Sequence, residues 1–128
     1  MILDTSAVVS VLFEEDGYGR LVEAMDGAEL VGIGAPTLVE ASMVMVGSFD
    51  LHGRAVLSRF LERNQVVVIG FEERHWKIAG EAFIRYGKGR HPAALNYGDC
   101  MTYATAQVAD APLLFVGDDF SKTDVAVA

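Results

Sequence analysis

The sequence predicts an α/β fold in which helices cover a central parallel sheet of about four strands. Short apolar segments alternate along the chain with longer segments of helical periodicity, and this alternation is typical of parallel sheets built from strand–helix–strand units. The chain has 128 residues, of which 52% are hydrophobic and 22% charged. That is enough to bury one core and too short for two ordinary domains, so we expect a single domain over residues 1–128.

Four short segments have the composition of buried strands. The third is the clearest, because it carries an uninterrupted run of β-branched residues. The four segments are residues 1–4 (MILD), 29–33 (ELVGI), 65–70 (QVVVIG) and 112–117 (PLLFVG).

Six segments have helical patterns, and several carry the residues that begin or end helices. Ser6 is expected near the N-cap of the first, Pro36 at the first position of the third, and Asn96 at the N-cap of the last. Gly87 follows the fifth, as is common after a helix. The six segments are residues 6–13, 18–26, 36–46, 52–63, 72–85 and 96–109.

The composition excludes some classes of protein. The formal net charge of −8 argues against a protein that coats nucleic acid or binds membrane surfaces, because such proteins are basic. It leaves room for an enzyme that handles phosphodiesters through metal ions. No apolar run reaches the roughly 20 residues that span a bilayer, and no export signal is visible. The one cysteine, Cys100, is expected in the core, and the chain in the cytoplasm.

Acidic residues stand at positions where parallel strands end or the following helices begin. Asp4 and the pair Asp118/Asp119 follow apolar strands, and Glu40 and Asp99 lie in the first turns of helices. Glu40 is the most unusual, because apolar residues surround it in its helix. That pattern predicts a helix buried on nearly all sides, and no lysine or arginine lies one turn away to pair with the carboxylate.

Each acid taken alone also has a structural explanation. Asp4 can cap the first helix, and the carboxylate of Glu40 can be stabilised by the dipole of its helix. Asp99 can form a capping box with Asn96, and Asp118 and Asp119 can form a turn. Taken together they favour another explanation. Strand C-termini and helix N-termini share one edge of a parallel sheet, so the acids can converge on a site for Mg²⁺ or Mn²⁺.

Polar and basic residues near these acids are candidate contacts for substrate. Ser6 and Asn96 could orient water or phosphate, although the residue types favour a simple helix cap at each position. Lys88 and Arg90 lie in a glycine-rich loop, "GKGRHPA", that leads towards Asp99. They could hold RNA phosphates, and the alternative is a solvated loop without a binding role.

Four segments resemble the PIN-domain ribonucleases that serve as toxins of VapBC toxin–antitoxin pairs. The segments are "ILDTSAVVSVL", "APTLVEASMVM", "YGKGRHPAALNYGDCMTYATA" and "PLLFVGDDFSKTD". The resemblance implies a three-layer α/β/α PIN-like fold with a parallel sheet of about four to five strands. It also implies Mg²⁺- or Mn²⁺-dependent endonucleolytic cleavage of RNA by metal-activated water, with Asp4, Glu40, Asp99 and Asp119 as catalytic and metal-binding acids. The doublet leaves Asp118 open as the fourth acid.

The resemblance further implies two protein partners. One is a second copy of the chain, and the other is a cognate VapB-type antitoxin whose basic segment would suit the acidic balance of this chain. Two other functions remain open on the residues. One is a non-catalytic module that binds an antitoxin through a degenerate metal site. The other is a receiver or phosphatase domain, which the Asp-Thr-Ser and Gly-Asp-Asp segments disfavour.

Overall fold

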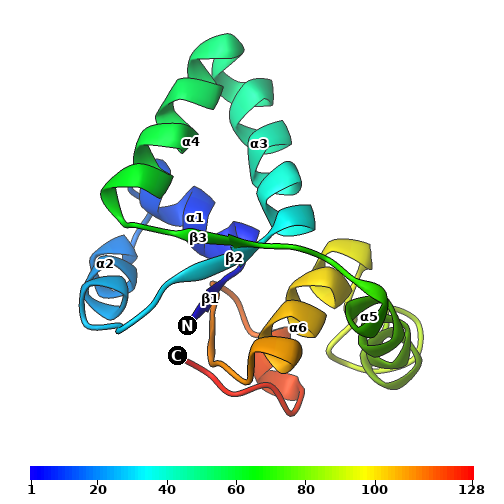
Figure 1. Ribbon diagram of the computed structural model, residues 1–128. Helices are drawn as coiled ribbons and strands as arrows, with labels where there is room; N and C mark the ends of the chain where they lie inside the picture. Colours follow the sequence, from blue (N-terminus) through cyan, green and yellow to red (C-terminus); the bar gives the residue numbers. More distant parts are fainter.

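The computed structural model describes residues 1–128 and has three layers, with a parallel sheet between two groups of helices (Figure 1). The sheet has four strands in the order β3-β2-β1-β4, and every neighbouring pair is parallel. The predicted α/β fold is therefore confirmed, with strands shorter than the segments expected. They are β1 (Ile2–Leu3), β2 (Gly32–Gly34), β3 (Val67–Ile69) and β4 (Leu113–Leu114).

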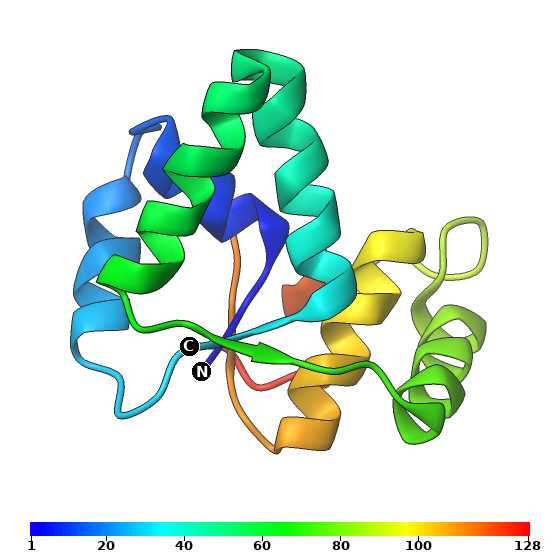
Figure 2. The ribbon, with the colours of Figure 1, turned by 45° about the horizontal axis from the view of Figure 1, so that its top comes forward.

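All six expected helices are present, and a 3₁₀ turn follows the last strand. The third runs three residues further than expected, to Phe49, and forms an antiparallel hairpin with the fourth that projects from the sheet (Figures 1 and 2). None of the helices combines the length and apolar composition that crossing a bilayer requires. The helical elements are α1 (Thr5–Leu12), α2 (Tyr18–Asp26), α3 (Ala35–Phe49), α4 (Leu51–Arg63), α5 (Glu73–Tyr86), α6 (Tyr97–Ala109) and η1 (Phe120–Lys122).

The two faces of the sheet carry separate hydrophobic cores, because successive strand residues point to opposite sides. Ile2 and Leu113 are register partners and pack with α5 and α6. Leu3 and Leu114, the next pair, pack on the other face with helices α1 to α4. The two-residue strands β1 and β4, the second of them at the edge of the sheet, thus contribute to both cores. Cys100 is 3% exposed in the first of these cores, as expected.

The expectation that α3 is buried on nearly all sides is wrong. Only Thr37, Ala41 and Met45, spaced four residues apart, are buried, and they form the face that packs inward. Val39 and Met43 are 54% and 69% exposed. The apolar residues on the outer side of this helix belong to the protein surface, and Glu40 lies at the boundary between the two sides, half-buried.

Candidate metal site and nuclease centre

The helices that carry Glu40 and Asp99 approach each other closely at the carboxyl edge of the sheet. Gly34, at the junction of β2 and α3, faces Thr105 of α6, and a Cβ at this glycine would lie 2.6 Å from the Thr105 hydroxyl oxygen. Only glycine allows this approach. The two helices pass each other in opposite directions, so that Thr37 lies against Thr102 and Glu40 reaches Gly98 at the N-terminus of α6 (Figure 2).

Asp4 is buried at this edge and accepts three hydrogen bonds. It is 6% exposed. Its Oδ2 accepts from the Ser6 backbone N–H at 3.0 Å and from Ser6 Oγ at 2.5 Å, and its Oδ1 accepts from Thr102 Oγ1 at 2.9 Å. Asp4, rather than Ser6, is the N-cap of α1. Asp4 is the cap because its carboxylate accepts a hydrogen bond from the Ser6 N–H, which has no partner within the first turn of the helix.

Ser6 is engaged on both sides of its hydroxyl. It donates to Asp4 and accepts from the Val116 N–H at 3.0 Å. The serine therefore links the end of β1 to the segment that follows β4. This contact orients Asp4, and the hydroxyl has no hydrogen left for another acceptor.

Glu40 has a neutral partner where a cation would be expected. Its Oε1 accepts a short hydrogen bond from Thr5 Oγ1, and its Oε2 lies against Gly98 of α6 so closely that a Cβ there would overlap it. None of the four ion pairs of the chain includes Asp4, Glu40, Asp99 or Asp119. Glu40 is thus held beside Asp99 without any charge neutralising it.

Asp99 both caps its helix and faces the other acids. Its Oδ2 accepts from the Asn96 N–H at 3.0 Å, and Asn96 Oδ1 accepts from the Asp99 N–H at 2.9 Å. The pKa of Asp99 is raised to about 6, mainly by burial and also by the negative charges of Asp4, Asp119 and Glu40, while the hydrogen bond from Asn96 acts in the opposite direction. The capping box and the coupling to the other acids, which were alternatives on the sequence, therefore occur together at Asp99.

Asp118 and Asp119, which follow β4, lie in different environments. Asp118 pairs with Lys122, with its Oδ2 3.4 Å from Nζ, whereas the charge of Asp119 acts on Asp99. Of the two, Asp119 is the one electrostatically coupled to the other acids. It remains exposed, while Asp4 is buried and Asp99 is half-buried.

The basic loop lies at the same end of α6 as Asp99. Lys88 and Arg90 are exposed and outside all ion pairs. Arg90 Nε donates to the Ile84 carbonyl in the last turn of α5 at 3.3 Å. The loop runs directly into the N-terminus of α6 (Figure 2), and neither cation forms an ion pair with the acids.

Two buried threonines complete the surroundings of Asp4, and the sequence did not single them out. Thr102 donates to Asp4, and Thr37 Oγ1 lies 2.9 Å from Thr102 Oγ1. A signal for both was present. Thr37 precedes Glu40 by three residues and Thr102 follows Asp99 by three, a spacing that puts each on the same helical face as an acid.

The donor chemistry fits a hard divalent cation. As they stand, no three carboxylate, histidine or cysteine side chains lie close enough together to hold a metal ion. However, carboxylate oxygens are the ligands that Mg²⁺ and Mn²⁺ prefer. Burial and the repulsion of the other acids together raise the pKa of Asp99, and a cation beside these acids would relieve the repulsion. The oxygens of Asp4, Glu40, Asp99 and Asp119 are thus of the chemical type that fits such a cation.

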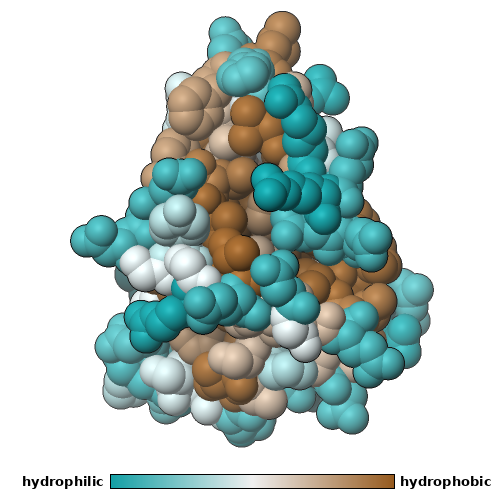
Figure 3. All heavy atoms as spheres, turned by 90° about the vertical axis from the view of Figure 1, so that its left-hand side faces the viewer, coloured by the Kyte–Doolittle hydropathy of each residue, from teal (hydrophilic) through white to brown (hydrophobic).

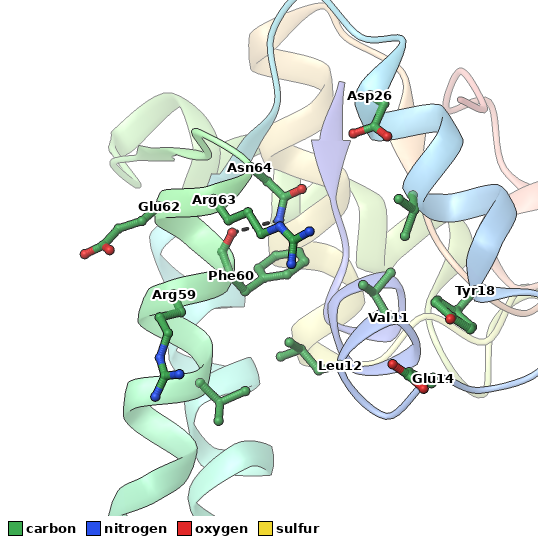
Figure 4. A pocket seen from close by; sticks show the side chains of 12 residues that line it. Val11, Leu12, Glu14, Tyr18, Asp26, Arg59, Phe60, Glu62, Arg63 and Asn64 are labelled. Carbon is green, nitrogen blue, oxygen red and sulfur yellow. Dashed lines mark hydrogen bonds between the residues drawn. The ribbon is translucent and has the colours of Figure 1, made fainter.

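A separate cleft of about 880 Å³ lies between α1, α2 and α4. It is at the opposite end of α1 from Asp4. Figure 3 looks onto this side and shows apolar residues gathered in a band between hydrophilic ones, and Figure 4 shows Arg59 and Arg63 of α4 across from Glu14 and Asp26. The apolar residues of the cleft are Val11, Leu12, Val22, Val56 and Phe60.

The same architecture occurs in solved toxin–antitoxin complexes. The structure of VapBC-1 from nontypeable Haemophilus influenzae matches with a TM-score of 0.79 at 17% identity, covering 99% of this chain and 95% of that chain. VapBC2 from Rickettsia felis bound to a promoter DNA fragment matches with a TM-score of 0.78 at 17% identity, covering 98% and 94%. At this identity the likeness concerns the fold.

Sequence comparison leads to a family. Ribonuclease VapC36 of Mycobacterium tuberculosis is 44% identical over 126 residues, or 98% of this chain and 91% of that relative. Ribonuclease VapC of Mycolicibacterium smegmatis is 38% identical, with 98% of both chains covered. The family model described as PIN domain matches residues 1–126. With its acids gathered at the carboxyl edge of a four-stranded parallel sheet, this chain belongs to the PIN-domain family.

Proposed function

We propose that this protein is a divalent-metal-dependent endoribonuclease that acts as the toxin of a type II toxin–antitoxin pair. The observation that carries the proposal is that Asp4, Glu40 and Asp119 all act electrostatically on the half-buried Asp99, while none of the four acids forms an ion pair. The names of the relatives, VapC ribonucleases at up to 44% identity, support the same activity. A non-catalytic module would have no need to hold four unpaired carboxylates together.

In this proposal each acid has a defined role. Asp4, Glu40, Asp99 and Asp119 hold Mg²⁺ or Mn²⁺, which supplies Lewis acidity and charge neutralisation for phosphodiester hydrolysis. Ser6 and Thr102 hold the Asp4 carboxylate in place, and Asn96 holds Asp99. Lys88 and Arg90 bind phosphates of the RNA strand on the approach to the acids. This activity places the chain in the cytoplasm, where RNA substrates are.

Metal removal tests the enzymatic proposal. The purified chain should cut a mixed-sequence RNA pool in Mg²⁺ or Mn²⁺ and stop in excess EDTA, and each cation should raise the Tm above the EDTA value, because a ligand that binds the folded state stabilises it. The Asp99→Asn variant, purified in the same way, controls for contaminating nucleases. Cleavage that continues in EDTA, or equal cleavage by the variant, would contradict the proposal.

The cleft between α1, α2 and α4 is the proposed seat of a VapB-type antitoxin. Its apolar floor and its rim of Arg59 and Arg63 facing Glu14 and Asp26 suit an amphipathic segment with charges of both signs. A segment that continued along α1 would reach the unpaired acids beside Asp4, where a basic side chain would be favoured. Surface apolar residues on another side, around Trp76, Phe83 and Ile84 of α5, are the proposed contact with a second copy of the chain.

Charge placed in the cleft should separate partner binding from catalysis. Val56→Asp puts a carboxylate on the floor of the cleft and should weaken antitoxin binding by at least about tenfold, while RNA cleavage stays unchanged. Val68→Asp, on the exposed edge strand β3, is the matched control.

Size-exclusion chromatography with light scattering measures both the complex with the antitoxin and the dimer of the free chain. The free chain should have a mass of twice 13.8 kDa. Undiminished antitoxin binding by Val56→Asp would place the partner elsewhere, and a monomeric mass would refute the dimer.

A further inference from the structure

The hydrogen bonds to Asp4 leave one of its oxygens able to bind a metal ion. A carboxylate has about four lone-pair positions. Two on Oδ2 accept from the Ser6 N–H and the Ser6 hydroxyl, and one on Oδ1 accepts from the Thr102 hydroxyl. The remaining position belongs to Oδ1, so Thr102 occupies the lone pair beside it.

The direction of the Thr102 hydroxyl is itself fixed. Thr102 is 0% exposed and Thr37 is 3% exposed, and their hydroxyl oxygens lie 2.9 Å apart. Because Thr102 gives its only hydroxyl proton to Asp4, the bond between the threonines must run from Thr37 to Thr102. The chain of donors therefore runs from α3 through α6 to the end of β1, through a region closed to solvent.

We infer that Thr102 is a positioning residue: with Oδ2 bonded by Ser6, its bond to Oδ1 prevents the Asp4 carboxylate from turning, so that only Oδ1 is presented to a metal ion, and Thr37 holds Thr102 in place. The inference rests on the proposed metal-dependent function. Coordination through one oxygen suits Mg²⁺ and Mn²⁺, which demand near-octahedral geometry. Ca²⁺ is larger and readily takes both oxygens of a carboxylate. The buried threonine pair would thus discriminate against Ca²⁺ as well as orienting the ligand.

The test measures metal binding to the full chain in the absence of RNA. Thr102→Val keeps the shape of the side chain and removes the donor, Thr102→Ser keeps the donor, and Thr105→Val is the control. Thr105 is also buried in α6, but its hydroxyl donates to the Met101 carbonyl of its own helix. Isothermal titration with Mn²⁺ and with Ca²⁺ gives the two dissociation constants for each variant.

The expected result is a change in selectivity. Thr102→Val should weaken Mn²⁺ binding by about 10- to 100-fold and Ca²⁺ binding less, so that the preference for Mn²⁺ over Ca²⁺ falls. Thr102→Ser should restore it, and Thr105→Val should match the parent chain. If Thr102→Val does not fold, Thr37→Val, which removes the donor to Thr102, should show a smaller change of the same sign.

Two results would overturn the inference. One is a ratio of the Mn²⁺ and Ca²⁺ dissociation constants in Thr102→Val that equals the ratio in the parent chain. If only Thr37→Val folds, the same result in that variant counts equally. The other is an equal change in Thr105→Val, which would mark a general effect of α6 packing. A parent chain that bound no Mn²⁺ and cut no RNA would instead refute the proposed function, so the two failures are distinguishable.

Discussion

Replacing Asp99 with asparagine is expected to abolish RNA cleavage and, in metal-free buffer, to make the folded chain more stable. The variant loses a proposed metal ligand, which should cost at least about 10²- to 10³-fold in rate, as loss of one charge-stabilising group commonly does. It also removes a negative charge that Asp4, Asp119 and Glu40 repel. The asparagine oxygen can still accept from the Asn96 N–H, so the helix cap is preserved.

The pH dependence of this gain follows from the direction of the pKa shift. Asp99 has a pKa of about 6 when folded against an ordinary 3.8, so the folded state binds its proton more strongly than the unfolded state. The stability of the parent chain relative to Asp99→Asn is therefore greatest below pH 4 and is lost as the pH rises to about 6. Above that the variant should melt about 2–4 °C higher in EDTA.

Thermal melts in EDTA at pH 4, 5, 6 and 7.5 measure this window. With Mn²⁺ present the order should reverse, because only the parent chain gains a tightly bound ligand. A variant that lost stability relative to the parent at pH 7.5 in EDTA would show that Asp99 is held mainly by its cap and not strained by the other acids.

Asp4→Ala is expected to lose cleavage to a similar extent and to lose stability as well. The alanine removes the acceptor of three hydrogen bonds and the N-cap of α1. The Ser6 N–H and the buried Thr102 hydroxyl then lack their partner, at a cost of about 2–3 kcal/mol. The two acid variants should therefore share their loss of activity and differ in the sign of their change in stability.

Urea unfolding in EDTA at pH 7.5, with Asp99→Asn run alongside, measures that contrast. Equal stability of Asp4→Ala and the parent chain would mean that the three donors to Asp4 find other partners in its absence. In that case the hydrogen bonds at Asp4 would not contribute to holding the end of β1.

The fold was predictable because local signals and the chain order agree. Alternating strand and helix patterns indicated a parallel sheet, and Pro36 and Asn96 marked helix starts that the structure places within one residue. The start of α1 was less certain, since both Asp4 and Ser6 are good caps. The choice between them depends on which oxygen reaches a free N–H, and the residue types do not reveal that.

Two features of the site could not be predicted from the sequence. An apolar helix surface looks the same whether it packs in a core or remains exposed, so the burial of α3 was overestimated from Val39 and Met43. The roles of Thr37 and Thr102 depend on two helices meeting at Gly34, a contact between residues 65 positions apart at the threonines. Spacing within one helix indicates a shared face but not which side chain of another helix lies opposite.

The order of the chain also decides when the acidic centre can form during synthesis. Val116, whose N–H binds Ser6, follows that serine by 110 positions, and Asp119 comes later still. The β4 strand that pairs with β1 beside Asp4 is the last strand of the sheet to be made. A nascent chain that has not yet reached β4 therefore lacks the complete centre.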